Sequence, residues 1–177
     1  LGGTLSGGAV NLSESTLLGV TASSGILSSV TVNGDLDLSA TNARVRIEGG
    51  TTFTIAHLKG NQSAIGFAPG SVLSGTILFE GPTTGVRSVE MNGSAGTFTV
   101  GASGIIRTTA DFAGSAQIGP GFQFGGSMTL VKFVNAPSHR ACGLIEMGYD
   151  ATRLAVMREK GDICHLTDLG GRPDVGK

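Results

Sequence analysis

Apolar and polar residues alternate with a period of two along many short runs in the first part of the chain. Between residues 28 and 50, for example, the runs VTV, DLDL and RVRIE are separated by Asn-Gly and by Ala-Thr-Asn. A period of two is the pattern of a half-buried strand, and no period of 3.6 residues persists across the breaks. The pattern therefore predicts an all-β region built from short strands.

The spacing of the corners favours one all-β architecture over another. Units of strand, Gly or Asn corner and strand, such as VTVNGDLDL and VRIEGGTTFTI, recur at an irregular interval of about 18–25 residues, which is typical of one coil of a β-solenoid. A sandwich or barrel places turns every 8–12 residues or so, and the Asn33-Gly34 and Asn92-Gly93 pairs would suit its hairpins. We favour a parallel β-helix, with the antiparallel fold as the alternative.

The low charge of the chain agrees with this choice. Only 14% of residues are charged, the formal net charge is −1, and there are 30 glycines among 177 residues. Strands stacked about 4.8 Å apart place each side chain beside its counterpart in the next coil, so like charges are disfavoured. The near-zero net charge argues against nucleic-acid binding. No apolar run has the length needed for membrane insertion as a helix.

The alternation also identifies the side chains that should face the interior. Each predicted strand has one apolar face, and that face should line the core of the coils. The expected core residues are Val30, Val32, Leu36, Leu38, Val45, Ile47, Phe53, Ile55, Ile77, Phe79, Val89, Phe98, Val100, Ile105 and Phe112, with Leu58 and Ile65 as further candidates.

A change in composition divides the chain near residue 130. Residues 1–130 hold 24 of the 30 glycines and 12 charged residues, whereas residues 131–177 hold 13 charged residues and both cysteines. We therefore expect a solenoid domain over residues 1–130 and a different segment over residues 131–177.

The second segment contains the one strong helix signal of the sequence. Asp150 suits an N-cap, residues 151–160 are good helix formers, and Gly161 suits the C-terminal end. The sequence predicts a short helix here. It would belong to a cap that covers the apolar end of the last coil. A partly ordered tail, or a segment that is no native continuation of the solenoid, are the alternatives.

The repeats of residues 1–130 resemble a known group of proteins. The stretches GGTLSGGAVNLSESTLLGVTASSGILSSVTVNGDLDLS and GTFTVGASGIIRT are similar to repeats of secreted bacterial parallel β-helix proteins, namely filamentous-haemagglutinin-like adhesins and autotransporter passenger domains. Phage tail-spike and tail-fibre β-helices share this pattern. The resemblance implies a secreted or cell-surface location, a structural or adhesive role and glycans or a surface protein as partners. It supplies no catalytic motif, and residues 131–177 depart from it.

Two acidic residues are the main candidates for catalysis. Asp35 and Asp37 lie two residues apart on one predicted strand and should share a face, as an acid/base pair in a carbohydrate-active β-helix would. The competing interpretation is a solvated outer face on which these residues meet Arg44 and Arg46 in surface ion pairs. A polysaccharide lyase or glycosidase is accordingly the alternative to a non-catalytic role.

The remaining candidates lie near the C-terminus. His139, Cys142, Cys164 and His165 are the residue types that bind zinc, but the adjacent Cys164 and His165 rarely reach one metal together. A Cys–His nucleophile would use the same residues and has no flanking signature. His57, alone at a strand end, is expected to be structural. The glycine-rich stretches precede no helix, so they predict no phosphate-binding loop. We expect no cofactor, and self-association through the solenoid ends.

The secreted type of protein that the repeats resemble predicts a disulfide between Cys142 and Cys164, because extracellular proteins oxidise paired cysteines. Alkylation without reduction, followed by mass spectrometry, should find neither thiol free. The same treatment after reduction should label both cysteines. Two thiols that react before reduction would exclude the disulfide.

Overall fold

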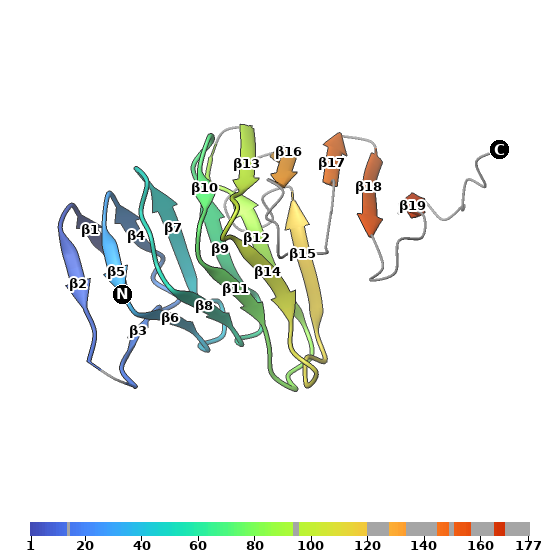
Figure 1. Ribbon diagram of the computed structural model, residues 1–177. Helices are drawn as coiled ribbons and strands as arrows, with labels where there is room; N and C mark the ends of the chain where they lie inside the picture. Colours follow the sequence, from blue (N-terminus) through green and yellow to red (C-terminus); the bar gives the residue numbers. More distant parts are fainter. Residues whose placement is uncertain are drawn as a thin grey trace.

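The protein is a stack of parallel β coils that runs along the chain from the N-terminus (Figure 1). The computed structural model describes residues 1–119 except 14, 94 and 95, and beyond these the backbone of four strands between residues 128 and 168. In the described residues all regular structure is β. The predicted all-β fold, a parallel β-solenoid, is therefore confirmed.

Sheet A receives the first strand of each successive coil. Its six strands are all parallel, and their order in the sheet follows their order in the chain. The strands are β1 (Thr4–Ser6), β4 (Gly25–Ser28), β7 (Arg44–Glu48), β9 (Ser63–Phe67), β12 (Val86–Met91) and β15 (Ser115–Gly119).

Sheet C receives the last strand of each coil and is also parallel throughout. Its strands are β3 (Leu17–Gly19), β6 (Asp35–Leu38), β8 (Ile55–Leu58), β11 (Thr76–Phe79) and β14 (Ile105–Thr108).

The strands between these two sheets form two smaller ladders. Sheet B pairs β2 (Ala9–Asn11) with β5 (Thr31–Asn33), and Thr31 also forms a parallel bridge with Thr52. Sheet D begins with β10 (Val72–Leu73) and β13 (Gly96–Val100). Each complete coil thus crosses three faces before it returns to sheet A.

The register aligns apolar residues with apolar residues from coil to coil. In sheet A, Leu27 pairs with Ile47 and Ile47 with Phe67, and all three side chains are buried. In sheet C, Leu36 lies beside Ala56, again in the interior. The interior is therefore built of rows that run along the stack, and each coil adds one residue to each row.

The corners require small residues because consecutive coils come close together there. A Cβ atom on Gly60 would lie 2.0 Å from the carbonyl oxygen of Ala40, and one on Gly75 would lie 2.3 Å from that of Phe53. The backbone of Gly60 donates a hydrogen bond to Leu38 in the preceding coil at 2.9 Å. Side chains at these positions would separate the coils, which explains part of the high glycine content.

The core agrees with the predicted alternation at most positions. Twelve of the fifteen expected core residues are buried, as are Leu58 and Ile65. Ile55 and Ile105 are only half-buried, and Phe112 packs against the core while partly exposed. Ile55 points outward because the chain turns a corner at Thr54, so the alternation that buries Phe53 is reset before β8.

The C-terminal strands change the pairing from parallel to antiparallel. β16 (Met128–Phe133) extends sheet D in parallel, and β17 (Ile145–Gly148), β18 (Ala151–Val156) and β19 (His165–Asp168) follow in antiparallel order. The division of the chain near residue 130 and the role of the second segment as a cap stay predictions.

The predicted helix over residues 151–160 is wrong where the structure describes it. Residues 151–156 form β18, which pairs with β17 on one side and β19 on the other, and residues 157–160 lie outside the described residues. Helix propensity is a weak prior of a few tenths of a kcal/mol per residue, and two neighbouring strands outweigh it.

We predict that Phe67→Ala destabilises the solenoid by about 3–5 kcal/mol, because it removes a buried ring from an interior row. Phe67 is 1% exposed, and its ring centroid lies 4.5 Å from that of Phe98. Urea unfolding followed by circular dichroism measures the change. The control is Val72→Ala, at a side chain 59% exposed, which should cost less than about 0.5 kcal/mol. Equal losses in both variants would contradict the assignment of the core.

Candidate functional site

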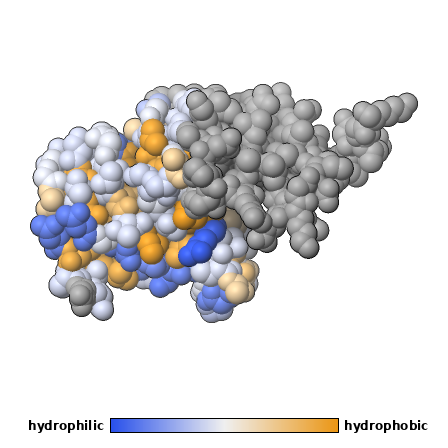
Figure 2. Space-filling view, in the orientation of Figure 1, coloured by the Kyte–Doolittle hydropathy of each residue, from blue (hydrophilic) through white to orange (hydrophobic). Residues whose placement is uncertain are grey.

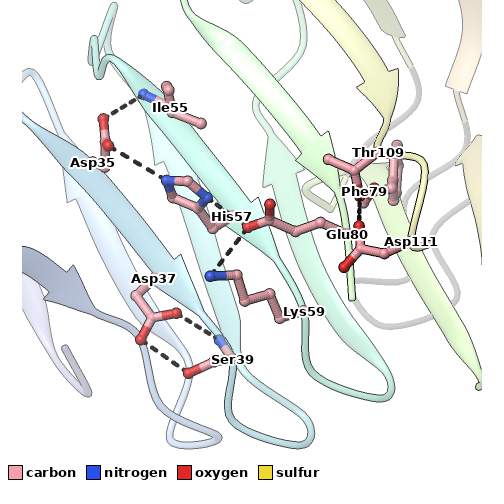
Figure 3. A network of polar contacts seen from close by, with 10 residues as sticks. All are labelled: Asp35, Asp37, Ser39, Ile55, His57, Lys59, Phe79, Glu80, Thr109 and Asp111. Carbon is pink, nitrogen blue, oxygen red and sulfur yellow. Dashed lines mark hydrogen bonds and ion pairs between the residues drawn. The ribbon is translucent and has the colours of Figure 1, made fainter. Parts of the chain in front are cut away.

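A group of ionisable side chains contact one another on the outer face of sheet C (Figure 3). On β6 the buried Leu36 and Leu38 alternate with the half-buried Asp35 and Asp37. The prediction that the two aspartates share one face of a strand is confirmed. The strands that follow β6 in the sheet bring further polar side chains to the same face.

Asp35 is held by the next coil through both carboxylate oxygens. Its Oδ1 accepts a hydrogen bond from the backbone N–H of Ile55 at 3.0 Å, and its Oδ2 lies 3.4 Å from Nε2 of His57. Asp35 therefore ties the start of β6 to the start of β8.

His57 continues this chain of contacts into a third coil. Its Nδ1 lies 2.6 Å from Oε1 of Glu80, the residue that follows β11. A neutral imidazole carries one N–H and a protonated imidazole carries two. The ring of His57 thus donates to Asp35 and to Glu80 at the same time only when it carries both protons. The expectation that His57 is structural agrees with this position between two carboxylates.

Lys59 adds a positive charge to the same glutamate. Its Nζ lies 3.3 Å from Oε1 of Glu80, and its side chain is 44% exposed while that of Glu80 is 14% exposed. An exposed ion pair of this kind contributes little to stability by itself. Oε1 of Glu80 thus lies within contact distance of both His57 and Lys59.

Asp37 has a different, local partner. Its Oδ1 accepts the backbone N–H of Ser39 at 3.1 Å, and its Oδ2 accepts the hydroxyl of Ser39 at 2.9 Å. These contacts stabilise the turn that follows β6, in the manner of an Asx turn. Although Asp37 is the register neighbour of His57, its side chain bonds to the turn instead.

The predicted ion pairs between the two aspartates and Arg44 or Arg46 are wrong. Both arginines lie on β7 in sheet A, whereas Asp35 and Asp37 lie on β6 in sheet C. The turn between β6 and β7, where Asn42 has a φ of 59°, is a coil corner and carries the chain to the next face. A hairpin would have placed the two strands side by side.

Two further groups of polar contacts lie on other parts of the outer surface. The hydroxyl of Thr109 donates to Oδ1 of Asp111 at 2.5 Å, and this hydrogen bond lowers the pKa of the Asp111 carboxyl. On sheet A, Nδ2 of Asn92 donates to Oε1 of Glu48 at 2.6 Å, over the strand between them. The first contact lies within one turn, and the second joins two coils that are not adjacent in the sheet.

Charged residues are few in the described part of the chain. Figure 2 shows mostly residues of intermediate hydropathy, with a few strongly hydrophilic groups beside hydrophobic ones. Asn33 donates from Nδ2 to Oδ1 of Asn11, its register partner, at 2.6 Å. Amide side chains stack in this way without the repulsion that like charges would cause.

The C-terminal candidates lie mostly outside the described residues. His139, Cys142 and Cys164 lie outside the described residues, and for His165 only its place in β19 is described. The zinc site and the Cys142–Cys164 disulfide stay predictions. Within the described part of the chain, no group of three His, Cys, Asp or Glu residues is arranged to hold a metal ion.

Comparisons with known proteins gave no relative. A scan against family models, a search of curated proteins and a search of solved structures found no match. Among the described residues, none forms a helix of the length and apolar character that a membrane span requires.

The cluster favours a structural role over acid/base chemistry. A general acid must release a proton and a general base must accept one, in contact with the substrate. In the structure all four carboxylate oxygens of Asp35 and Asp37 contact a donor group of the protein itself. The catalytic use of this pair stays a prediction.

We predict that a double-mutant cycle with His57→Ala and Glu80→Ala gives a coupling free energy of about 1 kcal/mol. The Asp35–His57 cycle should give a smaller value, because the side-chain contact is longer. The matched control is the Asp37–His57 cycle, in which the residues are register neighbours without a side-chain hydrogen bond. Urea denaturation gives the free energy of unfolding of the four single variants and the three double variants. A coupling for Asp37 as large as that for Glu80 would contradict the assigned contacts.

Proposed function

We propose that this chain is a segment of a secreted or surface-displayed β-solenoid that acts as a stalk or an adhesive surface and performs no catalysis. The observation that carries the proposal is that ionisable side chains on the outer face of sheet C bind one another across coils. Asp35, His57 and Glu80 come from three successive coils and bind one another. Their hydrogen bonds and ion pairs hold neighbouring coils together.

The architecture supports the same role. Coils that stack on one another along an axis make a rod, and its length grows with the number of coils. A largely uncharged outer surface with Ser, Thr, Asn and Gly offers many weak hydrogen-bonding positions. Repeated weak contacts reach a high avidity without any single deep site.

Glycans and proteins of a cell surface are the partners that fit this surface. Their hydroxyl and amide groups match neutral hydrogen-bonding side chains, whereas nucleic acid would require a positive field that a net charge of −1 does not supply. Self-association through the solenoid ends belongs to the same proposal.

A carbohydrate-active enzyme is the second candidate, favoured by one observation. Three half-buried groups that can transfer protons, Asp35, His57 and Glu80, are gathered on one outer face. A lyase or glycosidase built on a β-helix would need such a group of residues. A segment of a phage fibre is a further alternative, and a trimer in sedimentation would support it.

We predict that incubation with a panel of bacterial and plant polysaccharides releases no product. Reducing-end and unsaturated-uronate assays measure release, and a glycan array measures binding to the same sugars. Asp35→Asn and Asp37→Asn should leave any binding within about twofold, because both are conservative changes outside a binding cleft.

Product release that Asp35→Asn abolishes would overturn the structural role in favour of the enzyme. Asp37→Asn is the control for this outcome, since it changes an equivalent carboxylate with only a local partner. Tight binding to one glycan that depends on one of these residues would also contradict a surface of many weak contacts.

A further inference from the structure

Arg87 is the largest side chain that is fully buried in the described residues. It lies on β12 in sheet A, where the inward row is otherwise apolar or small. Its interior position follows from its register, because it alternates with the outward Ser88 and precedes the inward Val89 by two residues. A guanidinium in this place carries a positive charge into the solenoid.

The contacts of Arg87 offset this charge only in part. Nη2 donates to the carbonyl of Lys59 at 2.7 Å, and Nη1 donates to that of Gly85 at 3.1 Å. The ring of Phe112 lies 5.3 Å from the guanidinium carbon. Among the described residues no carboxylate pairs with Arg87, and burial lowers the pKa of its guanidinium. Buried charges are normally paired.

Two buried polar atoms beside this charge have no partner. Nε of Arg87 and Oγ of Ser63 are both enclosed and form no hydrogen bond with the protein. Ser63 is the register partner of Arg87 on β9, so the two side chains enter the interior from adjacent strands. Both groups are N–H or O–H donors. Two donors and a positive charge therefore converge on one part of the interior.

The side chains beside Arg87 at this level of the stack are small. The row that contains Arg87 includes Ser63, and Ala43 lies beside it in the preceding coil, where its carbonyl accepts the N–H of Ala64. One step further along the strands, the corresponding row holds Val45, Ile65 and Val89. The register neighbours of Arg87 are thus smaller than those of Val89.

We propose that Arg87 and Ser63 bind a small monovalent anion of the halide class inside the solenoid, between β9 and β12. Nε of Arg87 and the hydroxyl of Ser63 donate to the anion, and the guanidinium supplies the opposite charge. A water molecule would satisfy both donors but would leave the charge unpaired. The enclosed position excludes larger anions such as gluconate.

Chloride-dependent stability tests this site in the full chain. Urea unfolding is measured at constant ionic strength while sodium chloride or bromide replaces sodium gluconate. A ligand that binds only the folded state at ten times its dissociation constant raises the ratio of folded to unfolded protein about 11-fold. We expect a saturating rise of this kind with chloride and with bromide in the wild-type protein.

Two variants and a matched control connect the effect to the site. Ser63→Ala should raise the halide concentration needed for half the effect by tenfold or more, and Arg87→Met should abolish the response. Ser88→Ala is the control, because this hydroxyl lies on β12 next to Arg87 but points outward and contacts Glu90. It should retain the wild-type dependence.

Each result decides the proposal. Equal stability in chloride and gluconate, or a halide response that Ser63→Ala leaves unchanged, would overturn it and favour a bound water molecule. If Arg87→Met does not fold, the halide dependence of stability in Ser63→Ala, compared with that in Ser88→Ala, still tests the site. A crystal soaked in bromide should show an anomalous peak within about 3.5 Å of both donor atoms, and a peak confined to the surface would contradict the site.

Discussion

The parallel register between consecutive coils is the constraint on which the rest of this structure depends. Each coil places its residues directly beside their counterparts, which in sheets A and C are 18 to 29 residues away in the chain, and Ser29 likewise lies against Gly49. Backbone hydrogen bonds fix this alignment, and strand spacing brings the two side chains within about 5 Å. A residue is therefore tolerated only if it suits its counterparts in both neighbouring coils. Apolar rows inside, small residues at corners and few charges outside all follow from this condition.

The charged residues show how the constraint is met where charges do occur. On sheet C the neighbour of an acid is never another acid in direct register: Asp37 lies beside His57, and Asp35 beside Ile55. The side chains then reach along the face, so that His57 contacts carboxylates in the coils before and after it. Arg87 is the exception, since it points inward and meets mostly carbonyl groups. Its guanidinium is therefore the buried group that most requires an additional hydrogen-bonding or ionic partner.

Period-two alternation was enough to predict the strands, their inward faces and the shared face of Asp35 and Asp37, because these depend on neighbours two residues apart. It failed where the chain turns, since no pattern shows that Thr54 is a corner and Ile55 therefore points outward. The contact between His57 and Glu80 spans 23 residues. Because the coils differ in length, the sequence alone does not show which residues of neighbouring coils lie side by side. The helix predicted from residue 151 failed for another reason: propensity is local, whereas β18 is held by strands on both sides.

The same constraint bears on the choice between a structural and a catalytic role. A catalytic carboxyl must remain available to the substrate, and hydrogen bonds from the protein's own donors to both oxygens oppose its protonation. Asp37 is engaged by the turn of its own coil, and Asp35 by the backbone and the histidine of the next. Releasing Asp35 for chemistry would leave the N–H of Ile55 and the ring of His57 without these acceptors and would weaken the contact between two coils. Because stacking already uses these groups, the outer face of sheet C is better suited to maintaining a rod than to transferring protons.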